Sequence, residues 1–504
     1  MAKAAKQEPS PRRPIEPIEI PPRTWTVWAI GISLFFAFTR LIALRNSPLD
    51  LLPDEAQYWS WSRHLAFGYF SKPPMIAWLI RATTELAGGS DEWAVRLGAP
   101  LVHAGTGIVL AFLGRALFSA RAGFVAALLY TTLPGVIFSS LVISTDVPLL
   151  FFWALALLAL WQVLAKPDWR WAIVAGAAFG LGFLSKYAMG YFLLGLAVYA
   201  LTAPRNQLKA AWKHLVLAIL VAAGFIIPNL IWNSSHGWAT VGHTAANANW
   251  GQGAGLHLME ALSFAGAQFG VFGPVLLVAL ITRLVLWRRD PPPVQERFLL
   301  AFAVPVLALM IVQSGISRAH ANWAAVAYVP ATVLIVGWLE RIRRAWPINL
   351  TIALHLAAFV GFTLLFAGSV HATLPKGVDI FHQMRGWKSL ANLVWKRMAT
   401  MPGDASLAAD DREVLAELDY NLRGRSFPLV AATGKGPPGN QYELENPVTK
   451  ENGVHVLLVA RYADRAEILD RFDAHRMSEQ WTVGAGQGRR RLYFVYELTG
   501  FKGD

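Results

Sequence analysis

Long apolar runs alternate with short polar stretches from Trp25 to about Val370. Most runs have roughly 17 to 25 residues, the length of a helix that crosses the hydrocarbon core of a bilayer. The pattern therefore predicts a polytopic α-helical membrane protein with about eleven transmembrane helices. We expect them at 25–44, 93–113, 122–141, 147–165, 171–185, 187–203, 213–232, 259–282, 298–313, 323–339 and 348–370.

Residues 45–92, after the first run, are too long for a hairpin and mix aromatic side chains with charges. This composition is typical of amphipathic helices that lie in the membrane interface. Pro73-Pro74 should separate two such helices, because proline is tolerated at a helix start and breaks an interior. We therefore predict one or two interfacial helices in this first outer loop.

Residues 372–504 have the composition of a soluble domain, whereas 25–371 form the transmembrane domain and 1–24 a basic, proline-rich N-terminus. Helical periodicity and short apolar runs alternate in this tail, with a loop at Gly434–Gly439. We expect a small α/β domain outside the membrane. Its predicted helices are 387–398 and 411–422, and its predicted strands are 454–460 and 492–496.

The charge distribution sets the expected orientation. The chain is 55% hydrophobic and only 15% charged, and its net charge of +13 lies almost entirely in the membrane portion. Lys and Arg are concentrated in alternate loops, which is the positive-inside pattern of a membrane protein and calls for no nucleic acid. The N-terminus should be cytoplasmic and the tail periplasmic, in a bacterial inner membrane. The chain has no cysteine, which excludes disulfides and thiolate metal sites.

Ionisable residues in or beside apolar runs are costly, and here they collect on the expected outer side. Because loops at one face of a bundle converge, these side chains can surround one cavity. The candidates are Asp54, Glu55 and Lys72 of the first outer loop, Asp146 at the start of the fourth run, Lys186 in a tight turn, and Arg318 and His320.

Simpler explanations stand beside this one. Asp54 and Asp146 are also good helix N-caps, Lys72 can extend to the interface, and Arg318 and His320 can be solvated loop residues. Lys186 is harder to explain in this way, because it is a cation between two apolar runs. His236 and His243 of the long outer loop are interpreted as ordinary loop histidines.

Carboxylates and cations gathered at one site suit transfer of a group from a lipid phosphate. A carboxylate takes the proton of the acceptor hydroxyl, and cations hold the developing phosphate charge. No nucleotide-binding motif occurs, so the sequence gives no support for nucleotide chemistry. A divalent metal can supplement the cations, but no ligand spacing requires one.

Two motifs of the first outer loop carry a family resemblance: Pro53-Asp54-Glu55-Ala56-Gln57-Tyr58 and Tyr69-Phe70-Ser71-Lys72-Pro73-Pro74. With the order of spans and tail, they resemble the GT-C-type glycosyltransferases. Within these they resemble the aminoarabinose and galacturonic acid transferases of lipid A and the related protein mannosyltransferases. The likeness extends over essentially the whole chain.

The resemblance implies a role for several candidates. Asp54, together with Asp146, is the expected catalytic carboxylate. The resemblance also implies substrate binding by Glu55, Tyr58, Lys72 and Lys186. We also expect Tyr187, Arg318 and His320, which lie on the same outer side, to bind substrate. No residue is assigned to a metal. The aminoarabinose transferases have Glu where this chain has Ser71, so neither a metal site that relies on that Glu nor the same donor sugar is implied.

The expected function is transfer of a sugar from a polyprenyl-phosphate carrier to lipid A, the lipopolysaccharide core or another envelope glycan. The partners are thus a lipid-linked donor, a lipid or glycan acceptor, and membrane lipids. A protein O-glycosyltransferase has the same fold and differs in its acceptor. A transporter of lipid-linked sugars is the alternative from another class, but transporters place ionisable groups near mid-membrane and often show inverted repeats.

Overall fold

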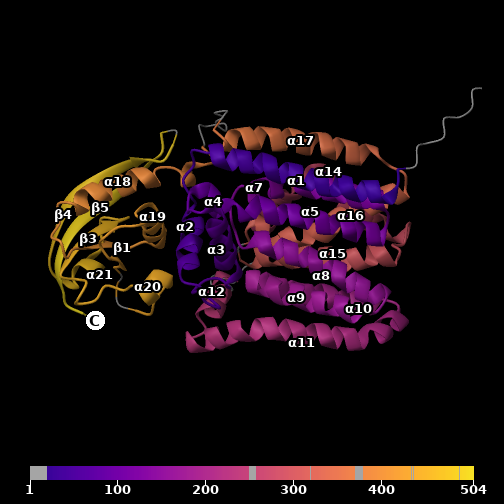
Figure 1. Cartoon of the computed structure of the whole chain (residues 1–504), viewed down its shortest axis with the longest axis horizontal. Coiled ribbons are helices and arrows are strands. Elements are labelled where there is room, and N and C mark those ends of the chain that lie inside the picture. Colours follow the sequence, from indigo (N-terminus) through magenta and orange to yellow (C-terminus); the bar gives the residue numbers. More distant parts are fainter. Residues whose placement is uncertain are drawn as a thin grey trace, which may run out of the picture.

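A helical bundle and a C-terminal domain built on a β-sheet make up the molecule (Figure 1). The computed structural model describes residues 20–248, 257–317, 319–368, 379–432, 434, 436–486 and 488–503. The predicted fold class, a polytopic helical membrane protein with a C-terminal α/β domain, is confirmed. The bounds and packing of the elements explain how the two parts meet.

Seven of the described helices are long and apolar enough to cross a membrane, or eight if one bent pair counts as a single span. Shorter apolar helices accompany them, so the expected count of eleven stays a prediction. The long helices are α1 (Pro22–Asn46), α4–α5 (Glu92–Arg96 and Gly98–Leu117), α8 (Asp146–Ala165), α11 (Arg205–Ser235), α15 (Val294–Ile316), η3–α16 (Ala321–Ala324 and Ala325–Arg341) and α17 (Trp346–Phe366). The shorter ones are α6 (Ala120–Thr131), α9 (Trp169–Ser185), and η1 with α10 (Tyr187–Gly190 and Tyr191–Thr202).

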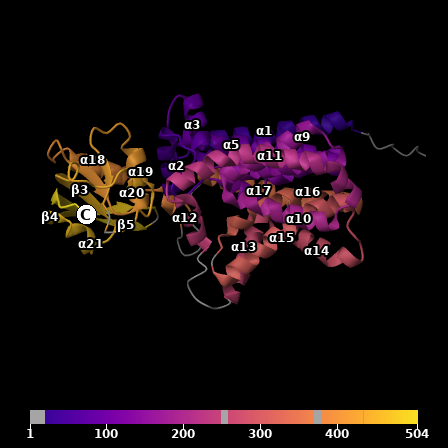
Figure 2. The same ribbon diagram turned by 90° about the horizontal axis from the view of Figure 1, so that it is seen from below.

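Two expected spans are interrupted. The span predicted at 122–141 stops at Thr131, and a short helix, α7 (Pro134–Ser139), follows, because proline disfavours helical geometry in the residue before it. The span predicted at 259–282 is divided into α13 (Leu258–Phe272) and α14 (Pro274–Val285), which meet at an angle of 116°. Gly273 makes this bend with a positive φ of 90°, a conformation that glycine adopts without strain. The bent pair is visible at the edge of the bundle in Figure 2.

Helix burial separates the centre of the bundle from its rim. The apolar stretches of α8 and α16 are mostly buried, and they form one large core with α5, α6 and α15. In contrast, α11 and α17 leave most of their apolar side chains exposed. Exposed apolar surface of this kind on a membrane-spanning helix suits contact with lipid.

Two helices of the first loop lie across one end of the bundle, between it and the C-terminal domain (Figure 1). They are α2 (Pro53–Arg63) and α3 (Met75–Ala87). Pro73-Pro74 separates α2 from α3, as the sequence predicts. Buried side chains of α2 and α3 share one apolar cluster with side chains of the C-terminal domain, so the loop joins the two parts of the molecule.

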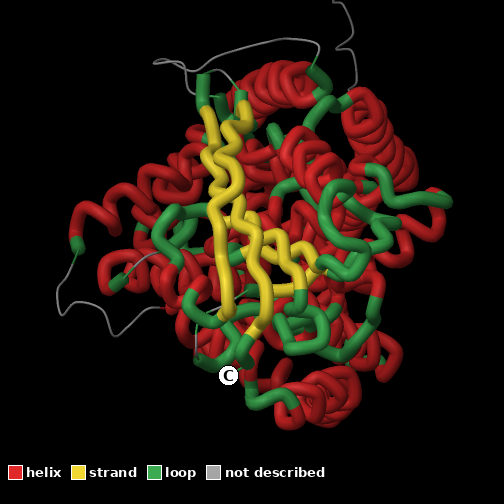
Figure 3. Tube along the Cα trace, turned by 90° about the vertical axis from the view of Figure 1, so that its left-hand side faces the viewer, coloured by secondary structure: helices red, strands yellow, loops and turns green. Residues whose placement is uncertain are grey.

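A five-stranded mixed sheet organises the C-terminal domain, with strand order β2-β1-β3-β5-β4. The first three strands in this order are parallel, and the hairpin of β4 and β5 adds two antiparallel strands. Viewed from this domain, the strands lie in front of the end of the bundle (Figure 3). The strands are β1 (Ser406–Ala409), β2 (Leu429–Ala431), β3 (His455–Ala460), β4 (Phe472–Gly484) and β5 (Arg490–Phe501).

Helix α19 (Arg412–Asn421) packs on α2, so it is the element of the sheet domain that reaches the first loop. Asp411 caps it by accepting hydrogen bonds from the amides of Glu413 and Val414. Because of this cap, the helix begins at Arg412, beside the loop. The remaining helices of the domain are η5 (His382–Met384), α18 (Trp387–Met398), α20 (Gln441–Glu445) and α21 (Ala466–Leu469).

Candidate active site

A cavity of about 560 Å³ lies where the first loop meets the helical bundle. Its polar lining comes from α2, the start of α8 and the segment around η3, and includes Asp54, Asp146, His320 and Asn322. The rest of its wall is mostly apolar and comes from α7, α13 and α16. A cavity with one polar part and one apolar part can take a ligand that has a charged head and a hydrocarbon tail.

Asp146 and Lys186 form an ion pair at this cavity. The Lys186 Nζ lies 2.7 Å from Asp146 Oδ1, and the amide of Asn322 donates to Asp146 Oδ2 over 2.8 Å. Asp146 is the first residue of α8 and Thr145 is its N-cap, so the N-cap alternative for Asp146 is wrong. Both carboxylate oxygens instead hold side chains from other elements, which fixes Lys186 at the end of α9.

Asp54 lies in the first turn of α2, where Leu52 and not Asp54 is the N-cap residue. Its Oδ1 accepts a hydrogen bond of 2.8 Å from the Arg412 guanidinium of the C-terminal domain, which also contacts Gln57. The Asp54 side chain is 60% exposed, and its Oδ2 has no hydrogen-bond partner among the described residues. One oxygen of Asp54 is thus open to an incoming hydroxyl group.

Glu55, the neighbour of Asp54, is completely buried and bound on all sides. Its carboxylate forms an ion pair of 2.7 Å with Arg96 and accepts hydrogen bonds from the amides of Leu52 (2.9 Å) and Ile143 (2.8 Å). These contacts tie α2 to α4 and to the loop before α8. Glu55 borders the cavity, but its contacts are those of a residue that positions its neighbours.

Lys72 is the cation of this region that lacks an anionic partner among the described residues. Burial lowers its pKa, and the nearby charge of Lys186 lowers it further, whereas Asp54 and Asp146 raise it. Two cations that repel each other beside two carboxylates form a place where a phosphate is stabilised. Lys72 is therefore placed to contribute charge to a bound anion.

The two predicted tyrosines have different surroundings. Tyr58 is buried in the wall of the cavity, and burial, followed by the charge of Asp54, raises its pKa well above the ordinary value. Tyr187 points to α11, where its hydroxyl donates to Asn229 Oδ1 over 2.9 Å. The amide of Asn229 donates in turn to the carbonyl of Phe67, so Tyr187 helps to hold the segment that carries Lys72.

His320 is exposed and lines the cavity, with its ring 5.4 Å from that of Trp323. Arg318 lies outside the described residues. The structure thus brings Asp54, Asp146, Lys186 and His320 to one region, as expected from their shared side of the membrane. Among the residues that the structure describes, no group of three or more His, Asp or Glu side chains could hold a metal ion.

Sequence reasoning missed one functional candidate, Arg412, and underrated two others, His243 and Asn322. Arg412 comes from the distant C-terminal domain, and no feature of the sequence links it to Asp54. His243 lies on α12 (Ala239–Ala248), where burial lowers its pKa and the positive charge of Lys72 lowers it further. Asn322 follows His320 by two residues, and an amide in an outer loop at the edge of a span is its only signal in the sequence.

The fold is that of a multi-pass membrane protein, and the site gathers carboxylates and cations of the kind that suit activation of a hydroxyl group and binding of a lipid phosphate. The chain belongs to the GT-C family of membrane glycosyltransferases. It is 35% identical, over 84% of its length and 88% of the relative's, to the lipid A galacturonosyltransferase RgtD of Rhizobium johnstonii. Residues 71–232 match the family model described as dolichyl-phosphate-mannose-protein mannosyltransferase.

Two further similarities involve aminoarabinose transferases. The undecaprenyl phosphate-alpha-4-amino-4-deoxy-L-arabinose arabinosyl transferase of Pseudomonas paraeruginosa is 29% identical over 41% of this chain and 40% of its own length. The crystal structure of ArnT from Cupriavidus metallidurans bound to undecaprenyl phosphate matches with a TM-score of 0.64 and 16% identity. That match covers 94% of this chain and 98% of the other, and it shows the shared fold.

Proposed function

We propose that this protein transfers a sugar from a polyprenyl-phosphate carrier to lipid A or the lipopolysaccharide core, at the periplasmic face of the inner membrane. The observation that carries the proposal is the meeting of two cations, Lys72 and Lys186, with Asp54 and Asp146, two carboxylates that line a cavity with an apolar wall. The lipid A galacturonosyltransferase among the relatives supports this acceptor, and it favours a uronic acid as the donor sugar.

The residues divide the chemistry in a specific way. The acceptor oxygen attacks the anomeric carbon while the bond from that carbon to the phosphate oxygen breaks, and the configuration inverts. Asp54 receives the proton of the acceptor hydroxyl, because its Oδ2 is open. The lipid phosphate leaves with the bonding electrons, and Lys72 and Lys186 stabilise its charge.

Asp146 has a supporting role in this mechanism. Both of its oxygens are occupied, by Lys186 at 2.7 Å and by Asn322 at 2.8 Å, so it orients the cation and leaves proton transfer to Asp54. Glu55 positions Asp54 through its ion pair with Arg96. The apolar wall of the cavity suits the first isoprene units of the carrier.

Mass spectrometry of lipid A tests the proposal in a strain that lacks the gene and is complemented with variants. Wild type should restore a sugar mass, whereas Asp54→Asn and Lys72→Ala should not, at equal protein levels in the membrane. Asp404→Asn and Lys450→Ala are the matched controls, since both residues lie on the surface of the C-terminal domain, and they should restore the mass.

Two outcomes would contradict the proposal at different levels. Activity of Asp54→Asn close to wild type would remove this residue as the base. Unchanged lipid A in the deletion strain, with a sugar lost from a membrane protein, would establish the protein O-glycosyltransferase alternative. Membership of a transferase family argues against the transporter alternative.

A further inference from the structure

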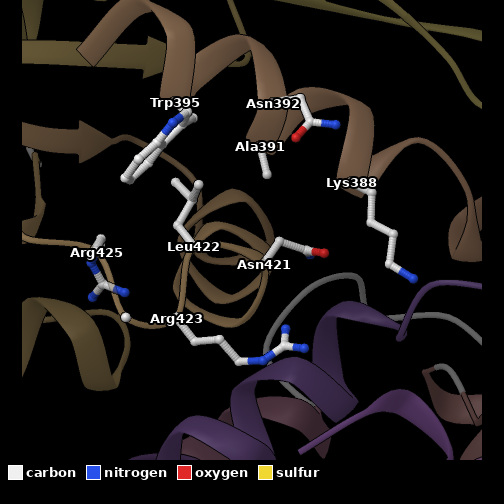
Figure 4. A pocket seen from close by; sticks show the side chains of 9 residues that line it. Lys388, Ala391, Asn392, Trp395, Asn421, Leu422, Arg423 and Arg425 are labelled. Atoms are coloured by element: carbon white, nitrogen blue, oxygen red, sulfur yellow. The ribbon is translucent and has the colours of Figure 1, made fainter. Parts of the chain in front are cut away.

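A second hollow, of about 440 Å³, lies in the C-terminal domain between α18 and the chain that follows α19 (Figure 4). Its lining contains three cations and, among the described residues, no carboxylate. The lining also contains an aromatic ring, two amide side chains and a few small or apolar residues. The residues that matter here are Lys388, Asn392 and Trp395 of α18, and Asn421, Arg423 and Arg425 at the end of α19.

The folding of the domain explains part of this arrangement. Arg423 donates to the carbonyl of Tyr420, and Arg425 donates to the carbonyl and the carboxylate of Asp419, as basic residues often do at a helix C-terminus. Trp395 is not explained in this way, because its side chain is 51% exposed on a helix whose other face is buried. An exposed indole beside cations suggests a ligand.

The ion pairs of Arg423 and Lys388 leave these two cations available to a ligand, whereas Arg425 is held in a 2.9 Å pair with Asp419 in which both side chains are mostly buried. The Arg423 guanidinium lies 3.8 Å from the carboxylate of Asp91, and both side chains are partly exposed. Lys388 is 56% exposed and contacts Glu92 at 2.7 Å. An exposed pair such as that of Arg423 with Asp91 contributes roughly 0–1 kcal/mol, so an anion with stronger hydrogen bonds can replace it.

We propose that this hollow binds the anionic sugar head of the acceptor. The inference rests on the function proposed above. The indole of Trp395 covers the apolar face of a sugar ring, Asn392 and Asn421 bind hydroxyl groups, and Arg423 and Lys388 bind a phosphate or carboxylate of the head. The class of ligand is a phosphorylated or acidic saccharide carried by a lipid.

Helix α19 connects this hollow to the candidate active site. Arg412, at its first residue, contacts Asp54, and Asn421, at its last residue, lines the hollow. Ten residues at 1.5 Å per residue give about 15 Å between the two ends. The acceptor therefore needs a head of more than one sugar unit, bound at one end while a hydroxyl at the other end reacts.

Steady-state kinetics with the purified full-length chain tests the proposal, with lipid A and a polyprenyl-phosphate sugar as substrates. The variants are Arg423→Gln and Trp395→Ala. The control is Arg476→Gln, because Arg476 forms a comparable exposed pair with Glu497 elsewhere in the domain. The KM for lipid A should rise about tenfold or more in the variants, since charge-assisted hydrogen bonds are lost, while kcat and the KM for the donor stay the same.

Direct binding gives a second measurement that does not depend on turnover. Wild type should bind lipid A that carries its phosphates more tightly than dephosphorylated lipid A, and Arg423→Gln should weaken this preference while its melting temperature stays that of wild type. An unchanged KM and an unchanged preference in the variants would overturn the proposal for the hollow alone. Wild type that transfers no sugar to lipid A would instead overturn the proposed function.

Discussion

Replacing Glu55 by alanine should destabilise the protein far more than an ordinary loss of one ion pair. The variant leaves the Arg96 guanidinium buried without its carboxylate, and it frees the amides of Leu52 and Ile143. Removing one partner of a buried ion pair costs about 3–5 kcal/mol, and each buried amide that loses its acceptor adds about 1–3 kcal/mol. A cost of about 3 kcal/mol already changes the folding equilibrium more than a hundredfold.

The matched control is Glu85→Ala in α3, where Glu85 pairs with Arg81 on the surface. That exposed pair should contribute less than about 1 kcal/mol. The assay is equilibrium unfolding of the purified protein in detergent, followed by circular dichroism. Glu55→Ala should shift the unfolding midpoint strongly, and Glu85→Ala should leave it almost unchanged.

A double-mutant cycle isolates the ion pair from the rest of the change. Glu55→Ala/Arg96→Ala should recover part of the loss, with a coupling of about 2–3 kcal/mol. Recovery is incomplete because Arg96 also donates to the carbonyls of Leu49 and Asp50. If the coupling is below about 0.5 kcal/mol, or if Glu55→Ala is as stable as Glu85→Ala, the buried pair does not hold the loop as described.

Three other substitutions test separate features. Burial and a neighbouring cation lower the pKa of Lys72, so the side chain should lose its charge, and the KM for the donor should rise, as pH increases through that lowered pKa. Lys72→Arg stays charged and should abolish this alkaline rise in KM. A pH profile of the variant identical to that of wild type would contradict the prediction. Burial raises the pKa of Glu417 well above its ordinary value, so the folded state holds the proton and the protein loses stability as pH rises from about 5. In Glu417→Gln, the melting temperature should no longer fall with pH in this way. An unchanged dependence of the melting temperature on pH would refute the prediction. Gly273→Ala should lower the melting temperature, because the backbone φ of Gly273 is positive and an added Cβ would lie 2.5 Å from His355 Nε2. Gly266→Ala is the control and should leave the melting temperature unchanged, because the space around Gly266 is open.

The alternation of apolar and polar residues in the sequence predicts helices and strands of the C-terminal domain correctly where one face or the whole of the element is buried. The helix predicted at 387–398 is α18, and the strand predicted at 454–460 is β3, one residue shorter. Strand β4 was missed because most of its side chains are exposed along an edge, so no alternation of apolar and polar residues marks it. The short β1 and β2 lack the length to be distinguished from loops.

The breaks in the predicted spans show a different limit. Pro134 and the pair Gly273-Pro274 are visible signals in the sequence, but the apolar composition continues across both. Hydropathy reports how much of a segment is apolar and not whether the helix is continuous. The bend of 116° at Gly273 therefore became visible only in the structure.

Within the site, topology placed Asp54, Asp146 and Lys186 on one side, because loops at one face of a bundle converge. The same reasoning cannot find Arg412, which follows Asp54 by 358 positions and reaches it only through tertiary packing. It also could not predict that Glu55 is buried against Arg96, since the resemblance identifies the motif and not the contacts of each member.

The interface between the first loop and the C-terminal domain limits how segments can be exchanged between related proteins in a chimera. The ring of Trp59 on α2 packs 5.1 Å from that of Tyr420 on α19, the Tyr420 hydroxyl donates to the carbonyl of Ser90, and the amide of Phe70 donates to Gln441. A chimera that replaces residues 379–503 alone would break these pairings. The transferable module is the C-terminal domain together with residues 47–97, and a designer who wishes to change the acceptor should move the two as one unit.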